Sequence, residues 1–218
     1  MASASRFAAV IYDCDGTLVD SELLNARCMV DMIAADHDIH LDAAGLEAEF
    51  RGGKFADMCA ILARRHRIDL GDDFTTRYRA YSSRVFENEL QPIPGVHAAI
   101  EAIGEPRCVA SSGPPIKLAT ALRVTGLADY FGDKVFSAYE IEAWKPEPDL
   151  FFHAARAMGV APADCAVIED SDAGVEAAHR AGMRVFGYDK KRTIGDHPNT
   201  DLTRFTDFAE LPGLLGRA

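Results

Sequence analysis

Two aspartates, Asp13 and Asp15, stand two positions apart directly after a short apolar run at residues 7–12. The run is too short for a helix of ordinary length and is stopped by a turn-forming segment. It therefore predicts a strand buried on both faces, the kind found in parallel sheets. Ligands of open α/β sheets bind at the carboxyl ends of the strands. Two carboxylates there, followed by the N–H and hydroxyl groups of Gly16 and Thr17, indicate a site for a divalent metal and a phosphate, although an ordinary turn has the same residue types.

Further polar residues follow other expected strands and favour the first interpretation. Ser111 and Ser112 come after one apolar strand, and Glu169 and Asp170 come after a later one. Lys145 lies on a loop before a proline, which restricts the local backbone. If these strands are parallel, all five side chains meet the first two aspartates at one edge of the sheet.

The combined set of side chains suits phosphoryl transfer. Four carboxylates at one edge repel each other and resist joint ionisation. A hard cation with oxygen ligands removes that conflict, and Mg²⁺ bound by one or two carboxylates, waters and a substrate phosphate is the expected form. Lys145 and Ser111 then supply a positive charge and a donor for the phosphate oxygens. One aspartate can be the nucleophile, and the other can protonate the leaving group and deprotonate water.

The elements that must position these groups alternate between strand and helix from about residue 93 onward, which predicts a parallel sheet with helices on both faces. Before that point, four amphipathic helices follow one another with no strand between them, and Ser21 or Asp20 and then Asp42 are placed to cap the first two. We therefore predict an α/β, Rossmann-like parallel-sheet core at residues 1–18 and 93–218. An inserted α-helical bundle, a cap domain, occupies residues 19–92. The tail after Lys190 has only a weak pattern and predicts no element.

The composition restricts the possible partners. A net charge of −11 disfavours nucleic acid and anionic membranes, whose recognition needs stripes of Lys and Arg. No apolar stretch approaches the roughly 20 residues that span a bilayer. The five cysteines have no metal-type spacing, which is typical of buried thiols in a reducing compartment. We expect a cytoplasmic protein, a monomer or weak homodimer, whose partner is a small phosphorylated metabolite.

The motifs also resemble, in order, the four motifs of the haloacid dehalogenase superfamily, on residues 13–20, Ser111, residues 145–146 and residues 169–171. The helical insertion resembles the small cap of its phosphoglycolate phosphatase and β-phosphoglucomutase branch. The surroundings of Lys145, WKPEP and FFHAARAM, are similar to those of bacterial 6-phosphogluconate phosphatases of this branch. The resemblance implies a Mg²⁺-dependent phosphatase for a small phosphorylated sugar or sugar acid, acting through an aspartyl-phosphate.

The same resemblance implies residue roles. Asp13 would be the nucleophile and Asp15 the general acid and base. Ser111, Ser112 and Lys145 would hold the phosphoryl group. The metal set would be Asp13, Asp15 through its carbonyl, Asp170 and, beside them, Glu169.

The cap is expected to contribute the residues that recognise the rest of the substrate. Arg51, Gly52, Gly53 and Lys54 lie between two cap helices and are placed to reach the site when the cap closes. The alternative for this segment is a solvated turn with surface cations.

Two other functions remain open. One is a β-phosphoglucomutase-like mutase, although mutases of this branch tend to have a histidine in the first cap helix where this chain has Asn25. The other is a non-catalytic module that binds a metal or phosphate. The presence of every expected functional side chain disfavours that module.

Overall fold

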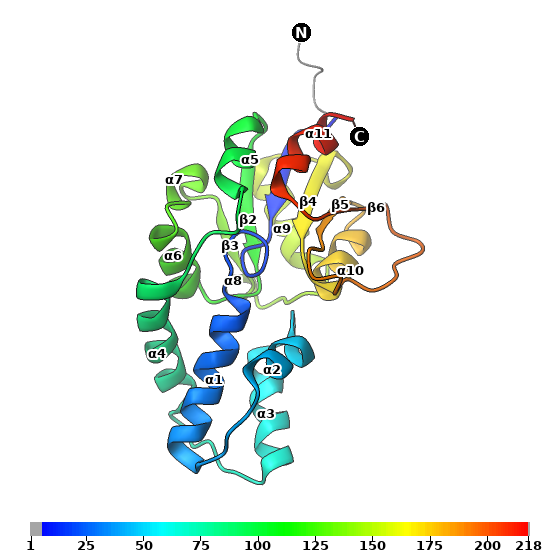
Figure 1. Cartoon of the computed structure of the whole chain (residues 1–218). Helices are drawn as coiled ribbons and strands as arrows, with labels where there is room; N and C mark the ends of the chain where they lie inside the picture. The colour runs from blue at the N-terminus through cyan, green and yellow to red at the C-terminus, as the bar shows by residue number, and fades with distance from the viewer. Residues whose placement is uncertain (1–5, 218) are drawn as a thin grey trace.

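The core is a parallel sheet of six strands in the order β3-β2-β1-β4-β5-β6. The structure, a computed structural model, describes residues 6–217, so the first five residues and the last residue of the expected core lie outside it. The predicted α/β Rossmann-like fold is confirmed (Figure 1). The strands are β1 (Ala9–Tyr12), β2 (Arg107–Ser111), β3 (Val135–Ser137), β4 (Cys165–Glu169), β5 (Arg184–Tyr188) and β6 (Leu202–Phe205).

Helices cover both faces of this sheet because alternate strand residues point to opposite sides. Val10 of β1 belongs to one buried cluster and Ile11 to the other. The cluster of Val10 includes residues of α5 (Val96–Ala102), α6 (Pro115–Val124), α7 (Ala128–Phe131) and α11 (Leu211–Arg217). The cluster of Ile11 includes residues of α8 (Ala138–Ile141), α9 (Asp149–Met158) and α10 (Asp172–Arg180). All four residues of β1 are buried, as predicted for a central strand of a parallel sheet.

Four helices between β1 and α5 lie together beyond one edge of the sheet (Figure 1). They are α1 (Glu22–His37), α2 (Ala43–Phe50), α3 (Phe55–His66) and α4 (Phe74–Glu89), and we call them the cap. The cap has an apolar cluster of its own, which includes Met29, Ile33 and Leu62. The chain passes between core and cap twice, once after β1 and once before α5. There the Ile93 N–H donates to the Leu18 carbonyl at 2.9 Å.

The ends of the cap helices only partly follow the predicted capping. Asp42 caps α2 as predicted, because its carboxylate accepts from the N–H groups of Ala44 and Gly45. Ser21 occupies the N-cap position of α1 but makes no side-chain cap. Its hydroxyl donates instead to the Asp15 carboxylate, so this residue belongs to the site.

Elements after Lys190 were not predicted. The chain continues into β6, the short 3₁₀ turn η2 (Phe208–Glu210) and α11. Strand β6 is an edge strand whose first three residues are partly or fully exposed, so it lacks the continuous apolar run that identified β1. Among residues 6–217, no helix combines the length and apolar character needed to cross a membrane.

Candidate active site

The register of three neighbouring strands brings their carboxyl ends together. Tyr12 of β1 pairs with Val109 of β2 and with Ile168 of β4. The polar residues that follow these strands therefore lie side by side, at the edge that faces the cap. A cavity of about 510 Å³ lies there. Its lining includes every residue predicted for the site: Asp13, Asp15, Arg51, Gly52, Gly53, Lys54, Ser111, Ser112, Lys145, Glu169 and Asp170.

Lys145 joins two of the carboxylates. Its buried Nζ donates to Asp13 Oδ1 at 2.5 Å and to Glu169 Oε1 at 2.7 Å. Burial by itself lowers the pKa of Lys145, but the two carboxylates outweigh burial and the pKa lies above its ordinary value. Burial raises the pKa of Asp13 to about 8; Lys145 opposes this rise and the charge of Glu169 adds to it. The pocket around Asp13 thus favours additional positive charge.

Glu169 has partners that differ from those of a metal ligand. Besides Lys145, its carboxylate accepts from the N–H groups of Asp170 at 2.8 Å and Ser171 at 2.7 Å, and from the Ser171 hydroxyl at 2.9 Å. Both carboxylate oxygens are therefore in use. Whereas the sequence placed Glu169 beside the metal, in the structure it orients Lys145 and the turn that carries Asp170.

Asp15 is held by a lysine that the sequence analysis missed. Lys117 Nζ donates to Asp15 Oδ1 at 2.7 Å, and the Ser21 hydroxyl donates to the same oxygen. Burial alone would raise the pKa of Asp15, but Lys117 and Ser21 outweigh it and hold the pKa below its ordinary value. The available signal was position, because Lys117 lies in the first turn of α6, the helix that follows the short loop after Ser111.

Asp170 receives one contact from the core and one from the cap. The Thr17 hydroxyl donates to Asp170 Oδ1 at 3.0 Å, and Arg51 Nη1 donates to Oδ2 at 3.2 Å. Gly16 lies so close that a Cβ at that position would collide with the Asp170 carboxylate. Burial, together with the negative charges of Glu169, Glu22 and Asp13, raises the pKa of Asp170 well above its ordinary value.

Arg51 belongs to a network of charges between cap and core. Besides Asp170, its guanidinium pairs with Glu22 Oε2 at 2.6 Å and with Glu47 on α2. Glu47 also pairs with Lys191 of the core at 3.0 Å. The solvated turn considered for this segment therefore does not describe Arg51, whose side chain is only 13% exposed.

The other predicted phosphate-binding residues lie at the end of β2, where Ser111 is the last residue of the strand and Ser112 is the first residue after it. Ser111 is buried, and its Oγ accepts from the Gly113 N–H at 3.1 Å. Ser112 is partly exposed and lines the same cavity. Both serines thus line the same cavity as Lys145.

The carboxylates of Asp13 and Asp170 fit the needs of a magnesium ion. In the described part of the chain, no three His, Cys, Asp or Glu side chains form a ready-made metal cluster, since Asp15 and Glu169 are turned toward lysines. Asp13 and Asp170 are left, both buried and both with a raised pKa. Two such carboxylates, supplemented by waters and a substrate phosphate, match the oxygen ligands that Mg²⁺ uses.

Comparison with known proteins identifies the family to which this chain belongs. Residues 7–182 match the family of haloacid dehalogenase-like hydrolases, and the chain belongs to that family. The haloacid dehalogenase-like protein ATU0790 from Agrobacterium tumefaciens strain C58 has the same fold, with a TM-score of 0.82, 27% identity and coverage of 97% of this chain and 98% of that one.

Within this family, the relatives of known activity that are similar to this chain include phosphatases. The 6-phosphogluconate phosphatase of Escherichia coli (strain K12) is 39% identical over 213 residues, which cover 96% of this chain and 95% of the relative. The fructose-1-phosphate phosphatase YqaB of the same organism is 29% identical over 82% of this chain and 94% of its own length. The chain is a phosphatase of the haloacid dehalogenase-like family.

Proposed function

We propose that this enzyme is a Mg²⁺-dependent phosphatase that hydrolyses a small phosphorylated sugar or sugar acid, with 6-phosphogluconate as a candidate. The observation that carries the proposal is the grouping of Asp13, Lys145 and Asp170 at one end of a cavity covered by the cap. The names of the two relatives, which act on 6-phosphogluconate and fructose 1-phosphate, support the substrate class. The proposal includes a cytoplasmic monomer or weak dimer, and the free state of all five cysteines supports a reducing compartment.

The residues divide the reaction into two displacements at phosphorus. A carboxylate oxygen of Asp13 attacks the phosphorus, and the ester oxygen leaves with a proton from Asp15. Asp15 then removes a proton from water, which attacks the aspartyl-phosphate, releases inorganic phosphate and restores Asp13. Lys145 and Ser111 hold the phosphoryl oxygens during both displacements. The contact with Lys117 favours the ionised, basic form of Asp15, so the first step requires Asp15 to gain a proton as the anionic phosphate enters.

The metal would be held by the carboxylates of Asp13 and Asp170 and the carbonyl of Asp15. When bound, Mg²⁺ neutralises phosphoryl oxygens and so lowers the repulsion between the phosphate and the attacking carboxylate.

The position of Asn25 favours hydrolysis over transfer to a second sugar. Asn25 lines the cavity, and the Tyr78 hydroxyl donates to its backbone carbonyl at 3.1 Å and to its side-chain Oδ1 at 3.4 Å. An amide at this position cannot exchange protons as a histidine can. Products formed from glucose 1-phosphate isomers distinguish the two reactions: a phosphatase releases phosphate, a mutase produces glucose 6-phosphate, and a non-catalytic module does neither.

Replacing Asp13 tests the nucleophile. Asp13→Asn keeps the size of the side chain but removes the attacking charge, so we expect the rate with Mg²⁺ and p-nitrophenyl phosphate to fall by about 10³-fold or more. Circular dichroism and thermal unfolding should show a folded protein. A rate close to that of the wild type would exclude Asp13 as the nucleophile.

Replacing Arg51 tests recognition by the cap. We expect Arg51→Ala to raise KM about ten-fold for sugar phosphates but only slightly for p-nitrophenyl phosphate, which lacks a sugar for the cap to contact. Arg64→Ala, an exposed arginine on α3, is the control. Equal effects on the two substrates would show that Arg51 acts through its contact with Asp170 and does not recognise the sugar.

A further inference from the structure

The cationic side chains that line the cavity fall into two groups. Lys145, Lys117 and Arg51 are each paired with carboxylates. Lys54 and Arg79, both from the cap, also line the cavity, but their contacts within residues 6–217 are with aromatic side chains and include no carboxylate. Within residues 6–217, the charges of Lys54 and Arg79 are therefore not paired with a carboxylate.

These two cations are supported by a pair of aromatic rings from the core. Lys54 Nζ lies 5.7 Å from the centre of the Trp144 ring, and the Arg79 guanidinium carbon lies 5.5 Å from that of Tyr139. The two rings pack edge to face with their centres 5.4 Å apart. A cation on an aromatic face keeps most of its N–H donors free, since the ring attracts charge without accepting a full set of hydrogen bonds. The arrangement positions both cations and leaves them able to bind an anion.

We propose that Lys54 and Arg79 bind a carboxylate at the end of the substrate remote from its phosphate, so that phosphorylated sugar acids are the preferred substrates. This inference rests on the proposed phosphatase function. The phosphate-binding groups belong to the core and these two cations to the cap, so one molecule with an anion at each end would bridge them. A cavity of about 510 Å³ lies within the usual size range for small organic ligands.

A carboxylate fits this end better than a second phosphate. The planar fork of Arg79 can form two parallel hydrogen bonds with a carboxylate, and Lys54 adds a point charge. A phosphate carries up to about two negative charges. The same cavity is also lined by the buried carboxylates of Asp13, Glu169 and Asp170. The smaller charge therefore meets less repulsion across the cavity.

The contribution of the substrate carboxylate can be measured with two substrates that differ only in that group. 6-Phosphogluconate and glucitol 6-phosphate share a six-carbon chain and differ at carbon 1, where one has a carboxylate and the other an alcohol. p-Nitrophenyl phosphate reports the phosphatase chemistry alone. Hexitol 1,6-bisphosphate places a second phosphate at the same end.

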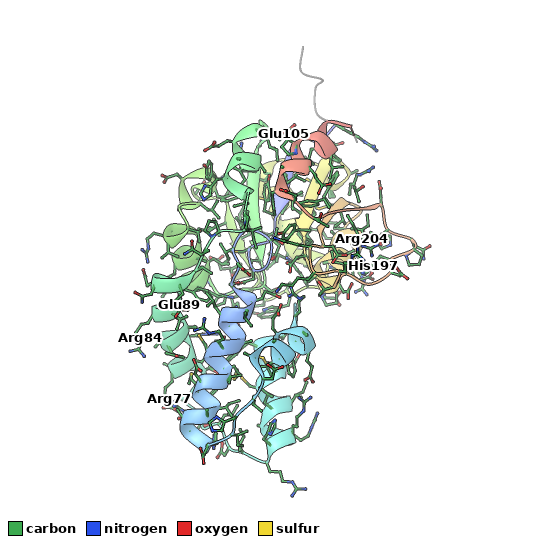
Figure 2. All side chains as sticks on the ribbon, in the orientation of Figure 1. Arg77, Arg84, Glu89, Glu105, His197 and Arg204 are labelled. Carbon is green, nitrogen blue, oxygen red and sulfur yellow. The ribbon has the colours of Figure 1, made fainter. Side chains whose placement is uncertain are left out.

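The variants remove charge while keeping the side-chain stems over the rings. Lys54→Met, Arg79→Met and the double variant are compared with Arg84→Met, which removes an exposed arginine from the same helix as Arg79. Figure 2 shows Arg84 on the outer side of α4, projecting away from the rest of the molecule. Thermal unfolding of each variant verifies that it is folded, and Arg79→Lys tests whether a charge alone restores binding.

We expect the wild type to prefer 6-phosphogluconate over glucitol 6-phosphate by about ten-fold or more in kcat/KM. Each single variant should raise KM for 6-phosphogluconate about ten-fold and the double variant about a hundred-fold. The values for glucitol 6-phosphate and p-nitrophenyl phosphate should change by less than about three-fold. Arg84→Met should behave as the wild type, and Arg79→Lys should recover part of the lost affinity.

Other results separate the two proposals. Turnover of p-nitrophenyl phosphate without a preference for the acid, or equal losses on the acid and the alcohol, would overturn the carboxylate site and leave the phosphatase function standing. A preference for the bisphosphate that the double variant abolishes would assign the cations to a second phosphate and overturn the carboxylate. A folded wild type that hydrolyses none of the esters with Mg²⁺ would overturn the proposed function itself.

Discussion

Each of three carboxylates in the cavity contacts a cation from a distant part of the chain. Asp13 pairs with Lys145, 132 residues away, and Asp15 pairs with Lys117, 102 residues away. Asp170 pairs with Arg51 of the cap, 119 residues away. Carboxylates taken out of water need such partners, because an isolated buried charge is strongly destabilising. At the residue scale, the site is a set of ion pairs. A metal ion must compete with the lysine and arginine side chains for the carboxylates, and the substrate phosphate must compete with the carboxylates for Lys145.

Lys117 offers a test at this scale. We expect Lys117→Met to lower kcat for p-nitrophenyl phosphate by about 10 to 100-fold with little change in KM, because Asp15 loses the contact that orients it without losing any group that binds the phosphate. Steady-state kinetics with saturating Mg²⁺ provide the measurement. Lys134→Met, a lysine beside Asp133 outside the cavity, is the control. A rise in KM with an unchanged kcat would instead place Lys117 on the substrate.

Helix α2 shows how one short element positions part of the site. It begins at Ala43, directly after the capping residue Asp42, and ends at Phe50, directly before Arg51. It also carries Glu47, which pairs with Arg51. An eight-residue helix is marginal by itself and depends on its cap and its packing. The direction in which Arg51 leaves α2 therefore depends on both ends of that helix.

The cap of α2 can be tested by stability. Asp42→Ala removes the acceptor for two N–H groups, so we expect the free energy of unfolding to fall by about 1 kcal/mol. Urea titration measures this change. Asp73→Ala is the control, because Asp73 occupies the N-cap position of α4 without a side-chain cap. Its carboxylate makes an exposed ion pair with Arg77, which contributes little to stability, so its effect should be smaller. Equal losses would show that the capping bonds of Asp42 contribute little.

At the scale of the whole molecule, cap and core meet through a close contact between Gly52 and Ser171. Gly52 has a φ of +68°, and a Cβ placed there would lie 2.8 Å from the Ser171 Cβ. Ser171 follows Asp170 directly, so this contact brings the cap loop to the core carboxylates. The ion pair between Glu47 and Lys191 adds a second connection, which gives the tail after Lys190 a role at the cap.

Gly52→Ala should move the cap loop away from the core. Trp144 is the single tryptophan and lines the cavity, so its fluorescence reports that movement. We expect a change in emission and a loss of about ten-fold in kcat/KM for sugar phosphates, with a smaller loss for p-nitrophenyl phosphate. Gly71→Ala is the control: it has a φ of +76°, but its nearest neighbour is Asp73 Oδ1 at 3.7 Å. If both variants behave alike, backbone strain and not the contact with Ser171 is responsible.

The amino-acid sequence predicted every strand of the sheet except β6, and also the polar residues at the strand ends, because a buried parallel strand requires a continuous apolar run and a turn must follow it. It also placed the four helices of the cap, whose apolar faces repeat with the helical period. The tail was missed, since an edge strand such as β6 needs no such run.

Only the tertiary structure decided which charges pair. Lys117 has no motif around it in the sequence, and α6 brings it beside Asp15. Glu169 was expected beside the metal, and in the structure the turn after β4 directs its carboxylate toward Lys145 and Ser171. The physical reason is that local patterns report burial and backbone shape, whereas an ion pair depends on the positions of two segments whose separation in space the sequence pattern does not encode.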